Sequence, residues 1–490
     1  MAGRAVRLPA QRIRQHRHAR GARRVTAAVA AGHPATVEAG VEILEAGGSA
    51  ADVAVAASLA SCVAETLMTG LLGGGHAIYY EAASGRAENL DCFVVMPGLG
   101  AERREGELLE LDVPFGAELI HYAVGIASCG VPGVPAGLDE LWRRHGRLEW
   151  PRLVAPALRL AGSGAELTPA HASCLQMLAP VMTMNEGARI YSPQGTLLPA
   201  GSRLEQPGLV RALELVADEG AASTYTGSIA RALLGLMEER GGLVTAADLE
   251  AYEAEWSEPI AVDYLGACFH TRGGLSGLPE TLPRVPPLAG LEEGERAVRL
   301  ARLLEGSGGD RLGDTTNITV VDGDGNACVL TTSLGLGSGD FLPGLDLHLN
   351  SMLGEADLIR GALEPGDRMD SMMAPSVVLR DGAMELAIGA AGGTRLRSAL
   401  IEVAAGVLDE GLPAGEAVGR PRLHAADGRV QLEPGFSNAT IAALEQNGFE
   451  VRVWPAQHHF FGGVSLVTPN DAAGDPRRSG AAARVPSPTR

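Results

Sequence analysis

The hydrophobic pattern predicts mostly helices in the first part of the chain and mostly short strands in the second. An apolar run at residues 25–31 predicts a buried strand that enters a turn at Gly32-His33-Pro34. Beyond the turn, apolar residues recur every three or four positions, and capping residues such as Ser49 precede the periodic segments. We therefore expect helices over residues 35–46, 50–63, 135–145, 151–161 and 246–252, and a strand over 77–81.

The pattern changes at Thr315, where β-branched residues become frequent and the apolar runs become short. Gly323-Asp324-Gly325 separates two such runs and predicts a β-hairpin. The chain is therefore predicted to be mixed α and β, with an antiparallel-rich second part. Strands are expected at 315–322, 327–334, 377–379, 385–388, 429–432, 451–453 and 463–467, and helices at 395–408 and 438–447.

The register of this hairpin brings four polar side chains together. A three-residue loop sets Asn317 opposite Thr331 and Thr315 opposite Ser333. Directly opposed side chains lie about 4.5–5.5 Å apart at Cβ, so these groups reach one another. A slip of one residue would place them on opposite faces of the sheet. Taken alone, the arrangement is also what an ordinary threonine-rich hairpin would contain.

Three segments lack a periodic pattern. Residues 1–24 hold eight arginines and no acid, and we interpret them as an unfolded arm, while binding to nucleic acid or anionic lipid stays open for this arm. Residues 271–314 are rich in Gly, Pro and Arg and predict a linker or mobile segment. Residues 469–490 are polar and predict a disordered end.

Composition and charge exclude several kinds of chemistry. All 40 basic residues are arginine, so no lysine is available for a Schiff base or a phosphate-binding P-loop. The net charge of −19 becomes more negative beyond the arginine arm, which disfavours nucleic acid and membrane as partners. The sequence has no apolar run of about 18 residues, and residues 25–31 are too short for a signal-peptide core. We therefore expect a cytoplasmic protein.

Common site motifs are missing from the sequence. The six cysteines are scattered without a CxxC pair, and no G-x-S-x-G motif occurs. Asp322-x-Asp324-x-Asn326 begins like a calcium loop, but Ala327 and Ser333 stand where such a loop needs glycine and a bidentate glutamate. His458-His459 has no third ligand nearby. The sequence therefore predicts no metal and no cofactor.

Residues 314–334 resemble the start of the small subunit of γ-glutamyltransferases, where the family pattern is close to TTHxSVVDxxGNAVxxTxT. Further stretches agree with this family in order, and together they span about residues 27–468. They are His33-Pro34, Ala46-Gly47-Gly48-Ser49-Ala50-Ala51-Asp52, Gly73-Gly74-Gly75, Gly130-Val131-Pro132-Gly133, Gly241-Gly242-Leu243-Val244-Thr245 with Asp248-Leu249, Leu349-Asn350, and Gly389-Ala390-Ala391-Gly392-Gly393-Thr394-Arg395.

The resemblance implies an α+β fold, the four-layer αββα sandwich of N-terminal-nucleophile hydrolases. It also implies a precursor that cuts itself between Asp314 and Thr315, into a large subunit of residues 25–314 and a small subunit of residues 315–490. Freed Thr315 would then supply a hydroxyl nucleophile and an α-amine base, whose pKa of about 7.7–8.0 leaves a useful neutral fraction without lysine or histidine.

The same resemblance implies roles for four further residues. Thr331 and Ser333 match the family's T-x-T pair, whose hydroxyls support the nucleophile. Gly392 and Gly393 would offer backbone N–H groups to the oxyanion of the transition state.

The residues that hold a γ-glutamyl group in this family have changed. Phe93 stands where the family has an arginine for the α-carboxylate, and an apolar ring cannot make that bidentate contact. We expect the chemistry to be kept and the γ-glutamyl specificity to be lost or weakened. The short interval between Gly274 and Thr315 also predicts a more open cleft. The other altered positions are Gly335 (for asparagine), Met352 (for glutamine), Glu355 (for aspartate) and Met372 (for serine), beside a retained Ser371.

Three functions stay open. The leading hypothesis is a self-processing threonine hydrolase with an altered acyl or keto-acyl substrate, including C–C bond hydrolysis as proposed for relatives in antibiotic biosynthesis. The first alternative is a conventional γ-glutamyl hydrolase or transferase whose clamp uses Glu355, Ser371 and Arg395. The second alternative is an inactive scaffold relative. The expected partners are a small-molecule substrate and the two subunits themselves, with further homo-oligomerisation left open.

Overall fold

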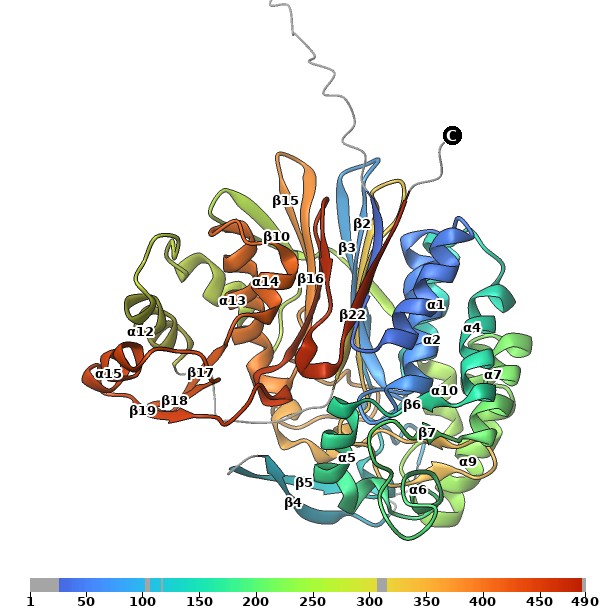
Figure 1. Ribbon diagram of the computed structural model, residues 1–490. Helices are drawn as coiled ribbons and strands as arrows, with labels where there is room; N and C mark the ends of the chain where they lie inside the picture. Colours follow the sequence, from blue (N-terminus) through green and yellow to red (C-terminus); the bar gives the residue numbers. More distant parts are fainter. Residues whose placement is uncertain (1–25, 102–105, 116–117, 306–314, 487–490) are drawn as a thin grey trace, which may run out of the picture.

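Two β-sheets lie face to face at the centre of the molecule (Figure 1). The computed structural model describes residues 26–101, 106–115, 118–305 and 315–486. Neighbouring strands in both sheets pair antiparallel. The first sheet has the order β22 (Ala481–Val485), β1 (Ala27–Ala31), β11 (Thr316–Val321), β12 (Ala327–Ser333), β2 (Gly74–Glu81), β3 (Arg86–Cys92) and β8 (Glu255–Ser257). The second has the order β21 (Ala472–Ala473), β20 (Gly463–Val467), β16 (Ala383–Ala391), β15 (Ser376–Arg380), β10 (Ala267–Thr271) and β9 (Ile260–Tyr264).

The facing sides of the two sheets share a layer of mostly small and aliphatic side chains. Ala28 and Val329 of the first sheet and Val377 and Ala387 of the second belong to one buried cluster. Side chains alternate across a strand, so each sheet presents a second apolar face to the outside, and helices cover it. This arrangement agrees with a composition in which aromatic residues make up only 4% of the chain.

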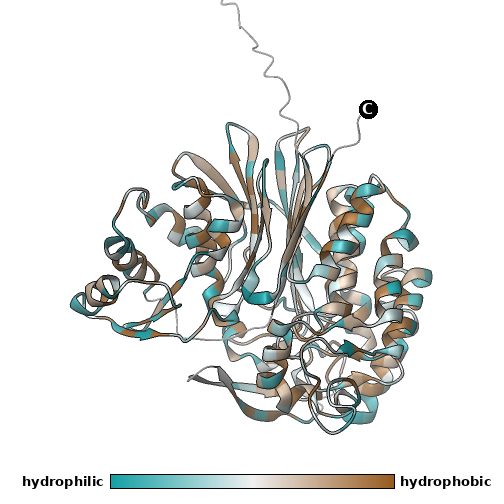
Figure 2. Cartoon of the chain, viewed as in Figure 1, coloured by the Kyte–Doolittle hydropathy of each residue, from teal (hydrophilic) through white to brown (hydrophobic). Residues whose placement is uncertain are grey.

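Helices cover the outer faces of both sheets (Figure 1). Every residue of α2 is buried, because its many alanines allow close packing against the first sheet and against α1 and α4. Outer helices such as α12 alternate brown and teal segments, as expected for one buried face (Figure 2). The first sheet carries α1 (Pro34–Glu45), α2 (Ala50–Ala64), α4 (Trp150–Ser163) and α7 (Pro207–Glu219), and the second carries α12 (Glu293–Leu304), α13 (Leu396–Leu408) and α14 (Ala414–Gly419).

The predicted helix starts are confirmed by side-chain caps. His33 accepts a hydrogen bond from the amide of Ala35 through Nδ1 at the start of α1. Ser49 forms a capping box with the third residue of α2, and Thr245 does the same at α10 (Ala246–Ala251). The strands and helices predicted after Thr315 are also present, with small shifts at their ends.

The remaining elements surround this centre. In the part of the chain that the structure describes, no helix is long and apolar enough to cross a membrane. The further helices are α3 (Val134–His145), α5 (Pro169–Met182), α6 (Gly187–Tyr191), α8 (Ala222–Tyr225), α9 (Ser228–Arg240), α11 (Leu278–Thr281) and α15 (Asn438–Gln446). The smaller sheets pair β4 (Leu109–Phe115) with β5 (Glu118–Val124), β6 (Ala165–Glu166) with β7 (Arg203–Leu204), β13 (Phe341–Leu342) with β14 (Leu347–His348), and β17 (Leu423–Ala426) with β18 (Arg429–Leu432) and β19 (Glu450–Val453).

Two predictions about irregular segments are wrong. Within the supposed linker 271–314, residues 293–304 form the amphipathic helix α12, whose Leu300 and Leu304 are buried in the core of the second layer. Its many charged residues lie on the outer face and masked the helical period. The supposed disordered end is ordered up to residue 486, because β22 adds its backbone to the edge strand β1 and needs no long apolar run. The arginine arm lies outside the described residues.

Candidate active site

The predicted register of the β11–β12 hairpin is confirmed. Thr316 pairs with Thr332 and Asn317 pairs with Thr331. Thr331 donates its hydroxyl to Oδ1 of Asn317 at 2.7 Å, on the side that faces the second sheet. Thr316 points to the helical side instead, where its hydroxyl donates to Oε2 of Glu65. Because side chains alternate along a strand, the polar contacts of Thr316 and those of Asn317 lie on opposite faces of the first sheet.

Thr315 lies just before β11 and is 5% exposed, at the meeting point of two cavities. We call the first one the methionine cavity, and it has about 360 Å³ of space, part of which is open to solvent. Eight of the residues singled out in the sequence belong to its wall. The wall consists of Phe93, Thr315, Ser333, Met352, Glu355, Leu358, Ser371, Met372, Met373, Gly393 and Leu396.

The apolar side of the methionine cavity is built from segments far apart in the sequence. Phe93 follows β3 and is 1% exposed, and its ring stacks on His76 with 5.3 Å between centroids. Burial, together with Arg272 and Arg368, holds the pKa of His76 well below its usual range, so this imidazole is neutral. Met352 and Leu358 complete the apolar cluster behind Phe93. The sequence did not point to Leu358, Met373 or Leu396, because isolated apolar residues carry no chemical signature.

The polar side of the same cavity carries Glu355 and Ser371. Glu355 occupies the space beside Gly335, since a Cβ added to Gly335 would lie 2.5 Å from Oε1 of Glu355 and 2.7 Å from the hydroxyl of Ser351. Gly335 also has a φ of +69°, which favours glycine. Gly335 is not itself among the lining residues, so its contribution is to leave room for the Glu355 carboxylate.

Gly392 and Gly393 connect the end of β16 to α13. Their φ values of +135° and +56° favour glycine, and Gly393 lines the methionine cavity. Gly392 lies against Gly462 instead, where an added Cβ would be 2.8 Å from the Gly462 Cα. Within the described part of the chain, the amide of neither glycine donates to a backbone carbonyl.

Arg395 and Thr331 lie outside the cavity walls. Arg395 is buried, donates from Nε to the carbonyl of Phe460 at 3.1 Å, and stacks over the Phe460 ring. It is not among the residues that line either cavity beside Thr315, so the structure does not place it in a substrate clamp. Thr331 is fully buried and contacts Asn317, which itself lines the second cavity. Asp314 lies outside the described residues.

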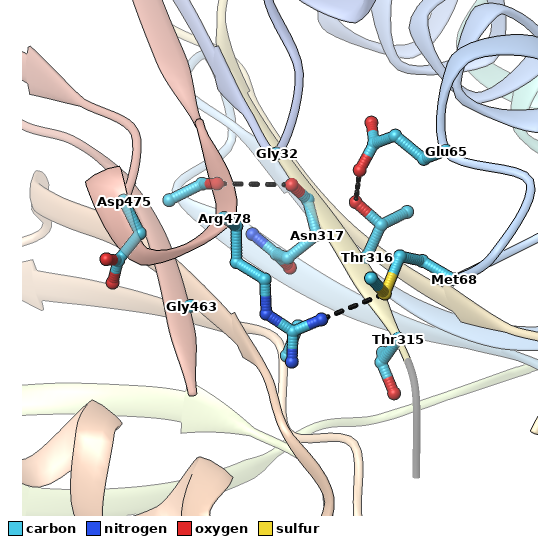
Figure 3. A pocket seen from close by; sticks show the side chains of 11 residues that line it. Gly32, Glu65, Met68, Thr315, Thr316, Asn317, Gly463, Asp475 and Arg478 are labelled. Carbon is cyan, nitrogen blue, oxygen red and sulfur yellow. Dashed lines mark hydrogen bonds between the residues drawn. The ribbon is translucent and has the colours of Figure 1, made fainter. Parts of the chain in front are cut away.

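The second cavity beside Thr315, which we call the arginine cavity, has about 260 Å³ of space, part of which is open to solvent (Figure 3). The guanidinium of Arg478 enters it between Asn317 and Thr315 and donates to the sulfur of Met68 at 3.0 Å. Glu65 lines the same cavity and accepts from Thr36 at 2.7 Å as well as from Thr316. Burial raises the pKa of Glu65, while His33 acts in the opposite direction.

Sequence reasoning missed these charged residues for identifiable reasons. Arg478 falls in the segment that was predicted to be disordered, and Glu65 follows an alanine-rich helix without any motif. Asp475 holds the Arg478 segment in place, since it accepts from Arg422 at 2.6 Å and from the amide of Val464 at 2.9 Å. Burial acts to raise the pKa of Asp475, but Arg422 and Arg477 hold it below its usual range. The available signal for order in this segment was Asp475-Pro476, followed by two arginines, Arg477 and Arg478.

In the described ranges, no group of three His, Cys, Asp or Glu residues could hold a metal ion. All six cysteines fall in those ranges, and no disulfide joins them. The arrangement instead offers a buried hydroxyl, adjacent glycine amides and a cavity of mixed polarity.

Two facing sheets, with Thr315 at the head of a central hairpin strand, therefore frame the candidate site. The chain belongs to the gamma-glutamyltranspeptidase family, whose model matches residues 36–278 and 300–485. Members of this family are hydrolases and transferases, so the chain is an enzyme of that type.

Relatives with two different names are similar to this chain. The Acylase ACY 1 proenzyme of Pseudomonas sp. (strain SE83) is 29% identical over 484 residues, covering 86% of this chain and 87% of the relative. A Glutathione hydrolase proenzyme of Pseudomonas aeruginosa is 28% identical over 475 residues, covering 81% and 82%. The crystal structure of cephalosporin acylase from Bacillus halodurans shares the fold, with a TM-score of 0.80, 21% identity and 98% coverage of both chains.

Proposed function

We propose that this chain is a self-processing threonine hydrolase of the four-layer αββα type, which removes an apolar acyl or keto-acyl group from its substrate. The observation that carries the proposal is the position of Thr315 beside the methionine cavity. Among the described residues that line this cavity there is no arginine, and Phe93 and Met372 occupy positions where the family holds a γ-glutamyl group.

Self-cleavage between Asp314 and Thr315 would release the α-amine of Thr315 and create the two subunits. The hydroxyl of Thr315 then attacks the substrate carbonyl while its own α-amine takes the proton. The tetrahedral oxyanion that forms is stabilised by the amides of Gly392 and Gly393, and the loss of one such donor typically costs about 2.7–4 kcal/mol of barrier stabilisation. Collapse breaks the bond to the leaving group, which takes the proton from the α-ammonium group.

The resulting ester is hydrolysed in a second half-reaction. A water molecule attacks the ester carbonyl and gives its proton to the α-amine, and the carboxylic acid leaves as the hydroxyl of Thr315 is restored. Ser333 lines the cavity together with Thr315, and Thr331 acts one step away through Asn317. The leaving group is an amine for an amide substrate and a stabilised carbanion for a keto-acyl substrate.

The chemistry of the cavity favours an uncharged acyl group. A carboxylate placed against Phe93 would lose its hydration without gaining a guanidinium partner, which is strongly unfavourable. The relative named as an acylase is consistent with this preference, whereas the relative named as a glutathione hydrolase represents the alternative of γ-glutamyl specificity.

Two measurements test the proposal. Purified protein, analysed by denaturing electrophoresis and N-terminal sequencing, should give two fragments, the smaller of which begins at Thr315, while Thr315→Ala should remain whole. The processed enzyme should hydrolyse octanoyl-p-nitroanilide faster than γ-glutamyl-p-nitroanilide. Preference for the γ-glutamyl compound would establish the conventional activity instead, and a wild-type chain that stays uncut would refute self-processing.

A further inference from the structure

Two arginines and one aspartate lie directly behind the walls of the methionine cavity. Asp91 is the last residue but one of β3 and lies two residues before Phe93. It faces both Arg272, which follows β10, and Arg368, which precedes the segment of Ser371. The nearest atoms are Asp91 Oδ2 and Arg272 Nη2 at 3.9 Å, and Asp91 Oδ1 and Arg368 Nη1 at 3.6 Å. We call Asp91, Arg272 and Arg368 the clasp.

One half of the clasp fixes Phe93 from both sides of its backbone. The amide of Phe93 donates to Oδ1 of Asp91 at 2.9 Å. The carbonyl of Phe93 accepts from Arg368 at 3.0 Å and from the hydroxyl of Tyr252 at 2.8 Å. With both backbone groups held, the direction of the Phe93 ring into the cavity is set by the clasp.

The other half of the clasp fixes Met372 in the same manner. Arg272 donates from Nη1 to the carbonyl of Ser371 at 3.1 Å and to the carbonyl of Met373 at 3.2 Å. These two carbonyls flank Met372, whose side chain lines the cavity. The approach is close because Gly274 has no side chain: an added Cβ there would lie 2.8 Å from the Ser371 carbonyl and 3.0 Å from the guanidinium.

Each half of the clasp also joins a residue of one proposed subunit to a residue of the other. Arg272 belongs to the segment before Thr315 and holds residues that follow it, whereas Arg368 follows Thr315 and holds Phe93, which precedes it. The only carboxylate that both guanidinium groups approach within 4.0 Å, among the described residues, is Asp91. A single guanidinium nitrogen, Nη1 of Arg272, donates to both carbonyls. Methionine has no donor for these carbonyls, and the ammonium group of lysine lacks the planar geometry that places Nη1 between them.

We infer that the clasp sets the spacing between Phe93 and Met372, and that Arg272 is a positioning residue for the size of the acyl group. The inference rests on the proposed function in so far as the methionine cavity holds that group. Replacing Arg272 removes the hydrogen bonds that hold the Met372 side of the cavity. Thr315, the glycine amides and Phe93 stay in place. Selectivity between acyl chains then falls, and the chemical step is largely kept.

The experiment compares Arg272→Met with the processed wild-type enzyme on p-nitroanilides of straight-chain acids from butanoyl to dodecanoyl. The ratio of kcat/KM between the best and the poorest chain length should fall about tenfold, through KM, with kcat changed by less than about threefold. Arg272→Lys, which keeps the charge but not the planar guanidinium, should restore only part of the ratio. Arg380→Met is the matched control, since Arg380 also binds a carboxylate and a backbone carbonyl, at Glu385 and Leu265, away from the cavity.

Hydrogen exchange supplies a readout that is independent of any substrate. Backbone amides of residues 371–374 should exchange faster in Arg272→Met than in the wild type, and at the wild-type rate in Arg380→Met. Unchanged exchange, or an equal loss of kcat/KM for every chain length, would overturn the role of the clasp. If the wild-type enzyme hydrolyses none of the acyl compounds, the proposed function fails, and the exchange rates still decide whether Arg272 holds this wall.

Discussion

Thr331 donates its hydroxyl to the amide oxygen of Asn317 at 2.7 Å, across the hairpin that begins at Thr315. Asn317 in turn donates a hydrogen bond from Nδ2 to the hydroxyl of Thr319 at 3.0 Å. Asn317 and Thr315 line the same cavity, so Thr331 reaches the wall beside Thr315 through Asn317.

Replacing Thr331 by valine should reduce both stability and rate. The change keeps the shape of the side chain but leaves the buried Asn317 oxygen without this donor, at a cost of about 1–3 kcal/mol in the free energy of unfolding. We expect kcat to fall about tenfold, since Asn317 then shifts beside Thr315. Thr332→Val is the control, because Thr332 makes a similar 2.8 Å contact with Thr69 on the helical side of the sheet. Equal losses of kcat in the two variants would contradict a role for Thr331 at the nucleophile.

Gly335→Ala should disturb the cavity beyond the cost of its backbone conformation. Left-handed backbone costs an alanine about 1–2 kcal/mol, and here the new Cβ would also push against the Glu355 carboxylate. Gly344→Ala separates the two effects, since Gly344 has a φ of +70° and no heavy atom within 4 Å of the added Cβ. We expect both variants to lose stability in chemical denaturation and only Gly335→Ala to lose activity. Similar activity in the two would show that Glu355 is not needed where it lies.

The sequence predicted the parts of this molecule that follow local rules. The capping boxes at Ser49 and Thr245 and the register of the hairpin at Asn317 and Thr331 are set by residues close in the chain, and all are confirmed. Contacts over long sequence distances could not be obtained in this way. Arg272 and Ser371 are 99 residues apart, and only the folded chain shows that one holds the other.

The C-terminal segment shows why composition alone misled the prediction. Residues 469–490 have few large apolar side chains, but β22 gains its order from backbone pairing with β1, and Asp475 is held by Arg422. Arg478 thereby reaches the cavity beside Thr315. Order that comes from pairing and from buried ion pairs leaves no hydrophobic period in the sequence.

Phe93→Arg should shift the preference of the enzyme toward a γ-glutamyl group. An arginine at this position would offer a bidentate partner to a substrate carboxylate, and it would also add a charge to an apolar wall next to His76. We expect the ratio of kcat/KM for γ-glutamyl-p-nitroanilide over octanoyl-p-nitroanilide to rise about tenfold or more. Phe93→Met is the control, because it keeps the wall apolar and should leave the ratio within about threefold of the wild type. An unchanged ratio in Phe93→Arg would mean that other residues exclude the glutamyl group.

Glu402 on α13 should make the free energy of unfolding fall as the pH rises. A paired carboxylate with a lowered pKa has the opposite effect. Burial raises its pKa to about 7, against an ordinary value of 4.5, although the amide of Leu423 donates to it at 3.1 Å. Between these two values the folded chain binds a proton that the unfolded chain has lost, so the free energy of unfolding falls as the pH rises from about 4.5 to about 7. The expected loss is about 3 kcal/mol from this one group.

Glu402→Gln should remove that dependence, because an amide stays neutral throughout. We would measure chemical denaturation between pH 4.5 and 8 on a Thr315→Ala background, which keeps one chain in every sample. The exposed Glu416→Gln on α14 serves as the control and should retain the wild-type slope. A Glu402→Gln variant that loses stability over this interval as steeply as the parent would show that Glu402 is ionised in the folded chain, stabilised by Arg296 and Arg422 beside it.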